Sequence, residues 1–122
     1  MKTIFVVDDT NINLLNAEKA LSEKYNVITM SSAAVMFEVL ADIRPDLILL
    51  DILMPVMDGF GALEKLKSDP KYADIPVIFL TGKNDGIIEA KGFKMGAIDL
   101  ISKPFSKPVL LNRLEKHLNI KK

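Results

Sequence analysis

The chain has 122 residues without a linker, a repeat or a low-complexity tract, so residues 1–122 are predicted to form one domain around a single hydrophobic core. It contains no cysteine, which excludes disulfides and thiolate chemistry, and its 16 basic residues balance its 16 acidic ones, which argues against binding nucleic acid or membranes through overall charge. No apolar run approaches the roughly 18 residues of a membrane span and no signal-peptide pattern is present, so we expect a cytoplasmic protein.

The first predicted strand leads directly into a pair of acids. Residues 3–7 are β-branched and aromatic, which is typical of a strand. The strand pattern stops at Asp8 and Asp9, and Thr10 is a good residue for starting a helix. Apolar residues at helical spacing then predict a first helix over residues 12–25.

A second short strand and a second helix follow. Residues 26–30 predict the strand, and the hydroxyl side chains of Ser31 and Ser32 favour the start of the helix. Pro45 ends the helix. The predicted inner face of this helix consists of Met36, Val39, Leu40 and Ile43.

Residues 47–51 read Leu-Ile-Leu-Leu-Asp and form the centre of the predicted fold. A short run of branched aliphatic residues predicts a strand that is buried on both faces, as in parallel sheets covered by helices. The run ends on Asp51, and a carboxylate at such a buried position is costly unless it has a function. The next turn signal is Asp58-Gly59, from which a third helix is predicted to begin.

The fourth strand and fourth helix are separated by a polar loop. Residues 76–80 predict a buried strand that ends on Thr81, and residues 82–86 are polar or glycine. The helix predicted over residues 87–95 contains Gly92, and an interior glycine costs a helix about 1 kcal/mol relative to alanine. We therefore expect this to be the least stable helix of the molecule.

The last predicted strand covers residues 99–102 and is followed by Lys103-Pro104-Phe105. A fifth helix is predicted from residue 106 or 107 to about Asn119. Five strands that alternate with five helices predict an α/β fold, a five-stranded parallel sheet with helices on both faces. We take the strand order 2-1-3-4-5 from flavodoxin-like folds, in which ligands bind at the carboxyl ends of the strands.

This strand order brings three carboxylates into one crevice. Asp8 and Asp9 follow the first strand, Asp51 ends the third, and like charges that close raise each other's pKa. A divalent cation would resolve the repulsion, and ligands that are all oxygen atoms favour Mg²⁺. Thr81 and Lys103 end the neighbouring strands, so a hydroxyl and an ammonium group point at the same crevice. Together these groups indicate a site for a phosphoryl group on a carboxylate oxygen, with Asp51 as the candidate nucleophile.

With these motifs in order, the sequence resembles response-regulator receiver domains of bacterial two-component signalling, which have the chemotaxis-type receiver fold. The resemblance covers essentially all 122 residues. The motifs that carry it are Val7-Asp8-Asp9, Asp51 with Met54-Pro55 and Met57-Asp58-Gly59, Thr81-Gly82, Gly96-Ala97, and Lys103-Pro104-Phe105.

The resemblance implies a role for each residue of the site. Asp51 would accept a phosphoryl group from a sensor histidine kinase or a phosphotransfer protein, and the chain would catalyse only its own phosphorylation and dephosphorylation. Thr81 and Lys103 would contact the phosphoryl oxygens, and the Lys103-Pro104 peptide bond would be cis. The implied Mg²⁺ ligands are Asp9, Asp51 and the backbone carbonyl of Leu53, with Asp8 acting mainly through water.

The resemblance also implies how the signal leaves the site. Thr81 would move toward the phosphoryl group and displace the following loop and the fourth helix, altering the face that controls an output domain or a downstream protein. Receivers usually carry Tyr or Phe three residues before the lysine, and here that residue is Leu100. We therefore expect the loop and helix to carry more of the response.

The same residues allow two alternative interpretations of the site. A Mg²⁺-dependent small-molecule phosphatase with an aspartyl intermediate usually has its two aspartates two positions apart, whereas Asp8 and Asp9 are adjacent. A flavin or nucleotide module would need a phosphate-binding loop after the first strand, where these acids would repel phosphate.

Two residues outside the site are part of what the resemblance implies: it suggests a phosphorylation-linked homodimer through Asp99 and Arg113. The histidine His117 is interpreted as a solvated residue that interacts favourably with the dipole of the last helix.

Overall fold

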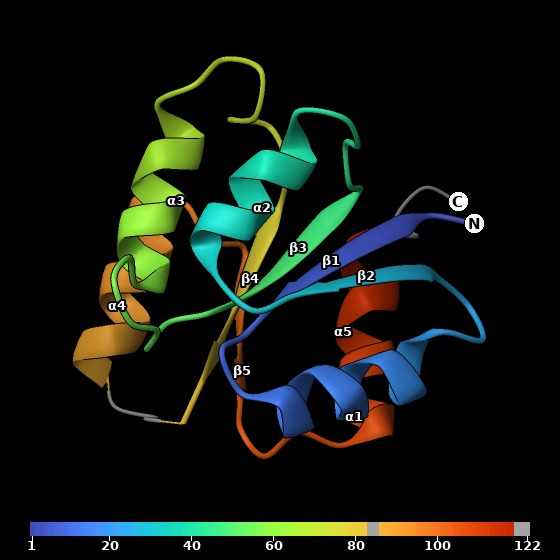
Figure 1. Ribbon diagram of the computed structural model, residues 1–122. Coiled ribbons are helices and arrows are strands. Elements are labelled where there is room, and N and C mark those ends of the chain that lie inside the picture. Colours follow the sequence, from blue (N-terminus) through green and yellow to red (C-terminus); the bar gives the residue numbers. More distant parts are fainter. Residues whose placement is uncertain (83–85, 119–122) are drawn as a thin grey trace.

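A computed structural model describes residues 1–82 and 86–118 of the chain (Figure 1). The strands and helices alternate in the predicted order. The strands are β1 (Thr3–Val7), β2 (Asn26–Met30), β3 (Leu47–Asp51), β4 (Val77–Thr81) and β5 (Asp99–Ser102). The helices are α1 (Asn11–Leu21), α2 (Ala33–Leu40), α3 (Gly59–Lys67), α4 (Gly86–Met95) and α5 (Lys107–Leu118).

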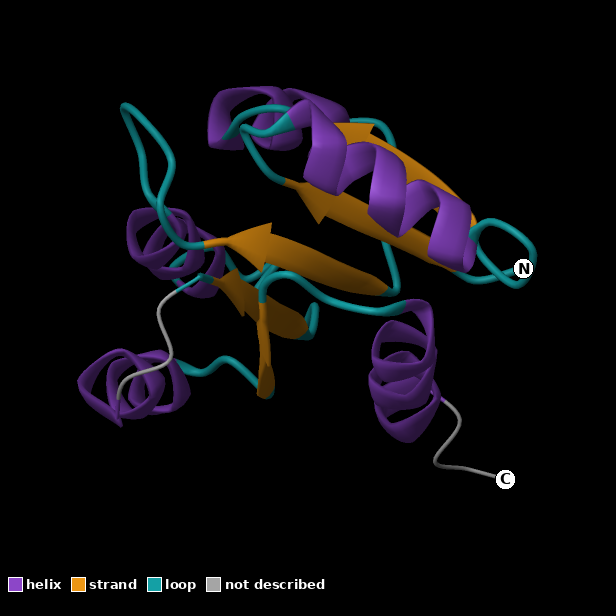
Figure 2. Ribbon diagram, turned by 90° about the horizontal axis from the view of Figure 1, so that it is seen from below, coloured by secondary structure: helices purple, strands orange, loops and turns teal. Residues whose placement is uncertain are grey.

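The five strands form one parallel sheet in the order β2-β1-β3-β4-β5, which confirms the predicted fold class and strand order. Helices α2, α3 and α4 cover one face of the sheet, and α1 and α5 cover the other (Figure 1). Figure 2 shows the sheet between these two layers. Because β3 lies between β1 and β4 and is covered on both faces, each of its residues is buried, as the apolar run predicted.

Alternate residues of the central strands point into two separate cores. Each core closes against one layer of helices, and burying a large apolar side chain contributes about 1.5 to 3 kcal/mol. On the side of α2 and α3 the core includes Phe5, Ile48, Leu50, Phe79, Met36, Leu63 and Leu66. On the side of α1 and α5 it includes Ile4, Val6, Leu49, Ile78, Ala17, Leu21, Leu110 and Leu114.

The first two helices are shorter than predicted. Helix α1 ends at Leu21 rather than at Tyr25, because Tyr25 lies in the turn before β2 and is buried by tertiary packing against the second core. Helix α2 ends at Leu40, so Ile43 no longer follows the phase of the helix, and 40% of its surface is exposed. The prediction that Ile43 faces inward is wrong.

The other boundaries agree with the predictions to within one residue where they can be compared. Strand β4 is shifted by one residue toward the C-terminus, and α4 begins at Gly86. The predicted end of the last helix near Asn119 and most of the polar loop over residues 82–86 lie outside the described residues. Across the described ranges, none of the helices has the length and apolar character that crossing a membrane requires.

Helix α4 touches the sheet through a glycine. Gly92 is the buried residue of this helix, and a Cβ atom added to it would lie 3.0 Å from Cδ2 of Phe79 in β4. The ring of Phe79 packs edge to face against Phe60 of α3, with centroids 5.3 Å apart. The ammonium group of Lys91 lies 4.3 Å from the centre of the Phe60 ring. The absence of a side chain at position 92 therefore lets α4 approach an aromatic pair.

Candidate functional site

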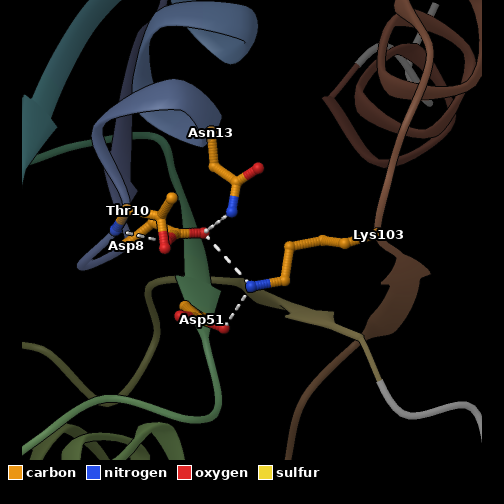
Figure 3. A network of polar contacts seen from close by, with 5 residues as sticks. All are labelled: Asp8, Thr10, Asn13, Asp51 and Lys103. Carbon is orange, nitrogen blue, oxygen red and sulfur yellow. Dashed lines mark hydrogen bonds and ion pairs between the residues drawn. The ribbon is translucent and has the colours of Figure 1, made fainter.

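The carboxyl ends of three strands bring an acidic cluster and a lysine together. Asp8 follows β1 and Asp51 ends β3. Lys103 follows the edge strand β5, and its side chain extends toward both carboxylates (Figure 3). The Nζ atom of Lys103 lies 2.8 Å from Oδ1 of Asp51 and 3.4 Å from Oδ2 of Asp8. The sequence therefore predicted correctly which charged side chains meet at this edge.

The Asp8 carboxylate is fully buried and has a donor on each oxygen. The backbone amide of Thr10 donates to Oδ1 at 2.9 Å, and Nδ2 of Asn13 donates to Oδ2 at 3.2 Å (Figure 3). The side chain of Thr10 makes no capping bond to α1, so the start of this helix is ordered instead through the Asp8 carboxylate. The contact of Asn13 with Asp8 was not predicted from the sequence. The sequence does contain a signal for it, because Asn13 lies in the first turn of a helix that begins beside two acids.

Three carboxylates can share one ion at this edge of the sheet. Asp8, Asp9 and Asp51 each offer one oxygen, and these oxygens all lie within 4.8 Å of one another. Asp9 is exposed, whereas the other two are buried, so the cluster is open to solvent on the side of Asp9. An all-oxygen ligand set suits hard divalent cations. The residues present therefore fit a metal ion of this class.

The charges of the cluster are unbalanced in the absence of a cation. Burial raises the pKa of Asp51 to about 6 and the charge of Asp8 adds to the rise, while the hydrogen bond from Lys103 opposes it. Burial lowers the pKa of Lys103, but its bonds to Asp51 and Asp8 outweigh this and raise the pKa above its ordinary value. The rise in the Lys103 pKa and the contribution of Asp8 to the Asp51 pKa both reflect nearby negative charge, which a bound cation would neutralise.

Replacing Asp51 by asparagine is expected to stabilise the metal-free protein above pH 6. The folded pKa of about 6 lies above the unfolded value of 3.8, so the folded protein loses stability as the pH rises between these values. A pKa shift of this size lowers the free energy of unfolding by about 3 kcal/mol when Asp51 is ionised. Because Lys103 loses its hydrogen-bond partner in the variant, we expect the free energy of unfolding to rise by only about 1 kcal/mol. Urea unfolding with EDTA at pH 4 and pH 7.5 measures this, and an equal gain at both pH values would contradict it.

The remaining predicted site residues lie at or near the same edge. Thr81 ends β4 and is 1% exposed, and the preceding residue, Leu80, pairs with Asp51 of β3. The backbone carbonyl of Thr81 accepts a hydrogen bond of 2.7 Å from the amide of Lys103. Leu53 is 61% exposed in the loop after β3. The Lys103-Pro104 bond is cis, as expected.

Leu100 lies inside β5, below the edge where Thr81 and Lys103 lie. It pairs with Phe79 and packs against the core formed with α2 and α3. An aliphatic side chain at this place contributes apolar packing and offers no ring to change rotamer.

The Asp58-Gly59 pair has more functions than the predicted turn. The Asp58 carboxylate accepts a 2.8 Å bond from the amide of Gly61 and so caps α3. The Gly59 amide donates to the carbonyl of Ile52 at 2.7 Å, and a Cβ atom on Gly59 would lie 2.4 Å from the carbonyl oxygen of Asp51. Only glycine allows the start of α3 to pack this closely on the end of β3, which fixes the backbone beside Asp51.

His117 is not the solvated residue that the sequence suggested. Its Nε2 atom lies 2.9 Å from Oδ2 of Asp99, and its side chain is 17% exposed. Arg113 lies one helical turn earlier and donates to Oδ1 of Asp99 at 2.9 Å and to the carbonyl of Leu100. Burial would raise the pKa of Asp99, but bonds from His117 and the Leu100 amide and the charge of Arg113 outweigh it and lower the pKa. The prediction of a solvated His117 is wrong because Arg113 and His117, four residues apart in α5, lie on the same side of the helix and both face Asp99 of β5.

Comparisons with known proteins agree with this geometry. The sequence profile of the response regulator receiver domain family matches residues 4–115. A "Probable cyclic di-GMP phosphodiesterase" of Vibrio cholerae is 41% identical over 120 residues, which are 98% of this chain and 27% of that protein. The chain thus spans about a quarter of the length of the first curated relatives that it matches.

Solved structures show the same architecture. The structure of the chemotaxis protein CheY4 of Vibrio cholerae has a TM-score of 0.91 at 27% identity and covers 97% of this chain and 99% of that one. The structure of the phosphorylated cyanobacterial phytochrome response regulator RcpA has a TM-score of 0.89 at 25% identity and covers 99% of this chain and 96% of that one.

Proposed function

Since this chain belongs to the response regulator receiver domain family and has its flavodoxin-like fold, we propose that it is a cytoplasmic signalling switch phosphorylated on Asp51. The observation that carries the proposal is the position of Asp51. Its side chain is 2% exposed at the end of a buried strand, 2.8 Å from a lysine and within reach of two further carboxylates. A carboxylate kept at this cost, with its counter-charge in place, is suited to covalent chemistry.

Phosphoryl transfer would use the side chains as follows. An oxygen of the ionised Asp51 carboxylate attacks the phosphorus of a phosphohistidine on a histidine kinase or phosphotransfer protein. The P–O bond to Asp51 forms as the P–N bond breaks, and the electron pair of that bond leaves with the imidazole. Lys103 neutralises charge on the phosphoryl oxygens, and the Thr81 hydroxyl donates to one of them.

Mg²⁺ is the cation that we propose for the acidic cluster. Asp9, Asp51 and the backbone carbonyl of Leu53 would hold it directly, and Asp8 would act through water. When bound, the ion neutralises negative charge on the transferring phosphoryl group. This assignment is supported by the all-oxygen ligand set and by the closeness of three carboxylates, of which Asp8 adds to the rise that burial causes in the pKa of Asp51.

Phosphorylation would then change the surface formed by α4 and β5. It adds about −1.5 to −2 units of charge at a buried position, which attracts donors such as Thr81. Thr81 ends the strand that leads to α4, so its movement would displace this helix. With Leu100 in place of an aromatic residue, we assign the response mainly to the loop after Thr81 and to α4.

The partners follow from the same proposal. A histidine kinase or phosphotransfer protein supplies the phosphoryl group, and residues 1–122 act as a receiver domain that controls an output domain or a separate protein. A phosphorylation-linked homodimer receives less support, because Asp99 and Arg113 already pair with each other within one chain. The chain would act on its own carboxylate only, and no contact of the described residues favours the alternative of a small-molecule phosphatase.

Incubation of the wild-type protein with acetyl phosphate is expected to add one phosphoryl group when Mg²⁺ is present. In EDTA we expect essentially no addition, because the carboxylates then repel the incoming phosphate. Intact mass spectrometry measures the addition, and fragmentation assigns it to a residue. Addition at a residue other than Asp51, or equal addition in EDTA, would overturn the proposal.

A further inference from the structure

Asn13 contacts the acidic cluster without contributing a charge to it. Its side chain is half-buried in the first turn of α1, and its Nδ2 atom donates to Oδ2 of Asp8 at 3.2 Å. The other oxygen of Asp8 accepts from the Thr10 amide (Figure 3). Two groups at the start of α1 therefore fix the plane of the Asp8 carboxylate from both sides, independently of Lys103.

Lys103 holds Asp8 less closely than it holds Asp51. Lys103 Nζ lies 3.4 Å from Asp8 but 2.8 Å from Asp51, and hydrogen bonds weaken beyond about 3.2 Å. In the proposed function Lys103 turns toward the phosphoryl oxygens. Asp8 then keeps the donors from Thr10 and Asn13. If Asn13 were also absent, the Thr10 amide would be the donor that remains to this buried carboxylate among the described residues.

We propose that Asn13 is a positioning residue that holds the Asp8 carboxylate against Asp9 and Asp51 and thereby sets the affinity of the cluster for Mg²⁺. The inference rests on the proposed function, since it concerns the same metal site. An amide suits this task because it is neutral. It orients Asp8 without cancelling the negative charge that attracts the cation, whereas a second lysine would cancel it. Groups that orient metal ligands typically change metal affinity by about 10- to 100-fold when they are replaced.

The test compares two asparagines of the same helix. Asn13→Leu keeps the size of the side chain and removes its donor, and Asn16→Leu makes the same change at an exposed position of α1. Titration with Mg²⁺, followed by NMR shifts of backbone amides, should show a Kd raised about 10-fold in Asn13→Leu and unchanged in Asn16→Leu. Unfolding in EDTA shows that both variants fold, and Asn13→Ala replaces Asn13→Leu if the latter does not. A Kd like that of the wild type, or equal weakening in both variants, overturns the inference.

Phosphorylation kinetics give a second measurement. The positioning variant should need about 10-fold more Mg²⁺ for half-maximal reaction with acetyl phosphate and reach the wild-type rate at saturating Mg²⁺. A loss of rate that Mg²⁺ does not restore would overturn the positioning role. If the wild type binds Mg²⁺ but gains no phosphoryl group, the proposed function fails, while the effect of Asn13 on the Kd remains measurable. If labelling of Asp51 needs Mg²⁺ and both Kd values are equal, only this inference fails.

Discussion

Replacement of Asp51 by alanine is expected to abolish the gain of a phosphoryl group from acetyl phosphate in the presence of Mg²⁺. Asp51 ends the central strand β3 and is the cluster carboxylate closest to Lys103, at 2.8 Å. Asp8 lies farther from this lysine, at 3.4 Å, and its oxygens accept bonds from Thr10 and Asn13, so we do not expect it to replace Asp51 as the acceptor. Its removal should leave the fold intact, because the charge of a buried carboxylate with a raised pKa opposes folding at neutral pH. Intact mass after a fixed time of incubation measures the result.

The control for this experiment is Asp42→Ala, which removes an exposed aspartate that follows the end of α2. It should label like the wild type. Circular dichroism and urea unfolding establish that both variants are folded. Labelling of Asp51→Ala at the wild-type level would show that another residue is the acceptor, and loss of labelling in both variants would point to a cause other than the site.

Replacement of Gly59 by alanine should cost about 2 to 3 kcal/mol of stability, the upper part of the range for overpacked positions. The added Cβ would lie 2.4 Å from the carbonyl oxygen of Asp51 and 2.8 Å from Cα of Ile52. Both are backbone atoms at the buried end of β3 and cannot rotate away as a side chain could. Relief requires α3 to move off the end of β3, which also displaces the backbone beside Asp51. Urea unfolding measures the loss, and the rate of phosphorylation should fall with it.

A glycine two residues later provides the matched comparison. A Cβ on Gly61 would meet Cγ of Met57 at 3.3 Å, and this partly buried side chain can give way by a few tenths of an ångström, unlike backbone. Since alanine is favoured over glycine inside a helix by up to about 1 kcal/mol, Gly61→Ala should be neutral or stabilising. If the two variants lose equal stability, the close approach of Gly59 to β3 is not the cause.

The sheet and the charged residues at its edge could be predicted from the sequence because both follow from short-range patterns. Apolar runs mark the buried strands, and a parallel sheet places the carboxyl ends of its strands together, so the positions of Asp8, Asp51, Thr81 and Lys103 follow from where each run stops. The metal-binding potential of the cluster follows in turn from the chemistry of three carboxylates.

Features that depend on contacts between elements could not be predicted in the same way. The pairing of His117 with Asp99 depends on the rotation of α5 about its axis, and the bond from Asn13 to Asp8 depends on how α1 leaves its strand. Ile43 was misplaced because a helical pattern does not show where the helix stops. The need for glycine at position 59 arises from a distance across the chain that no local pattern records.

The glycine contact under α4 has a mechanical consequence. Helices α3 and α5 bury leucine side chains that interlock with the sheet, and sliding either helix along its axis would require these side chains to leave their pockets. Helix α4 buries Gly92 alone among its residues and rests bare backbone on the flat ring of Phe79. The contacts that α4 makes with the core besides Gly92 come from the partly buried side chains of Ile88 and Met95. A shift of α4 along its axis should therefore meet less resistance than the same shift of α3 or α5, which have fully buried leucines.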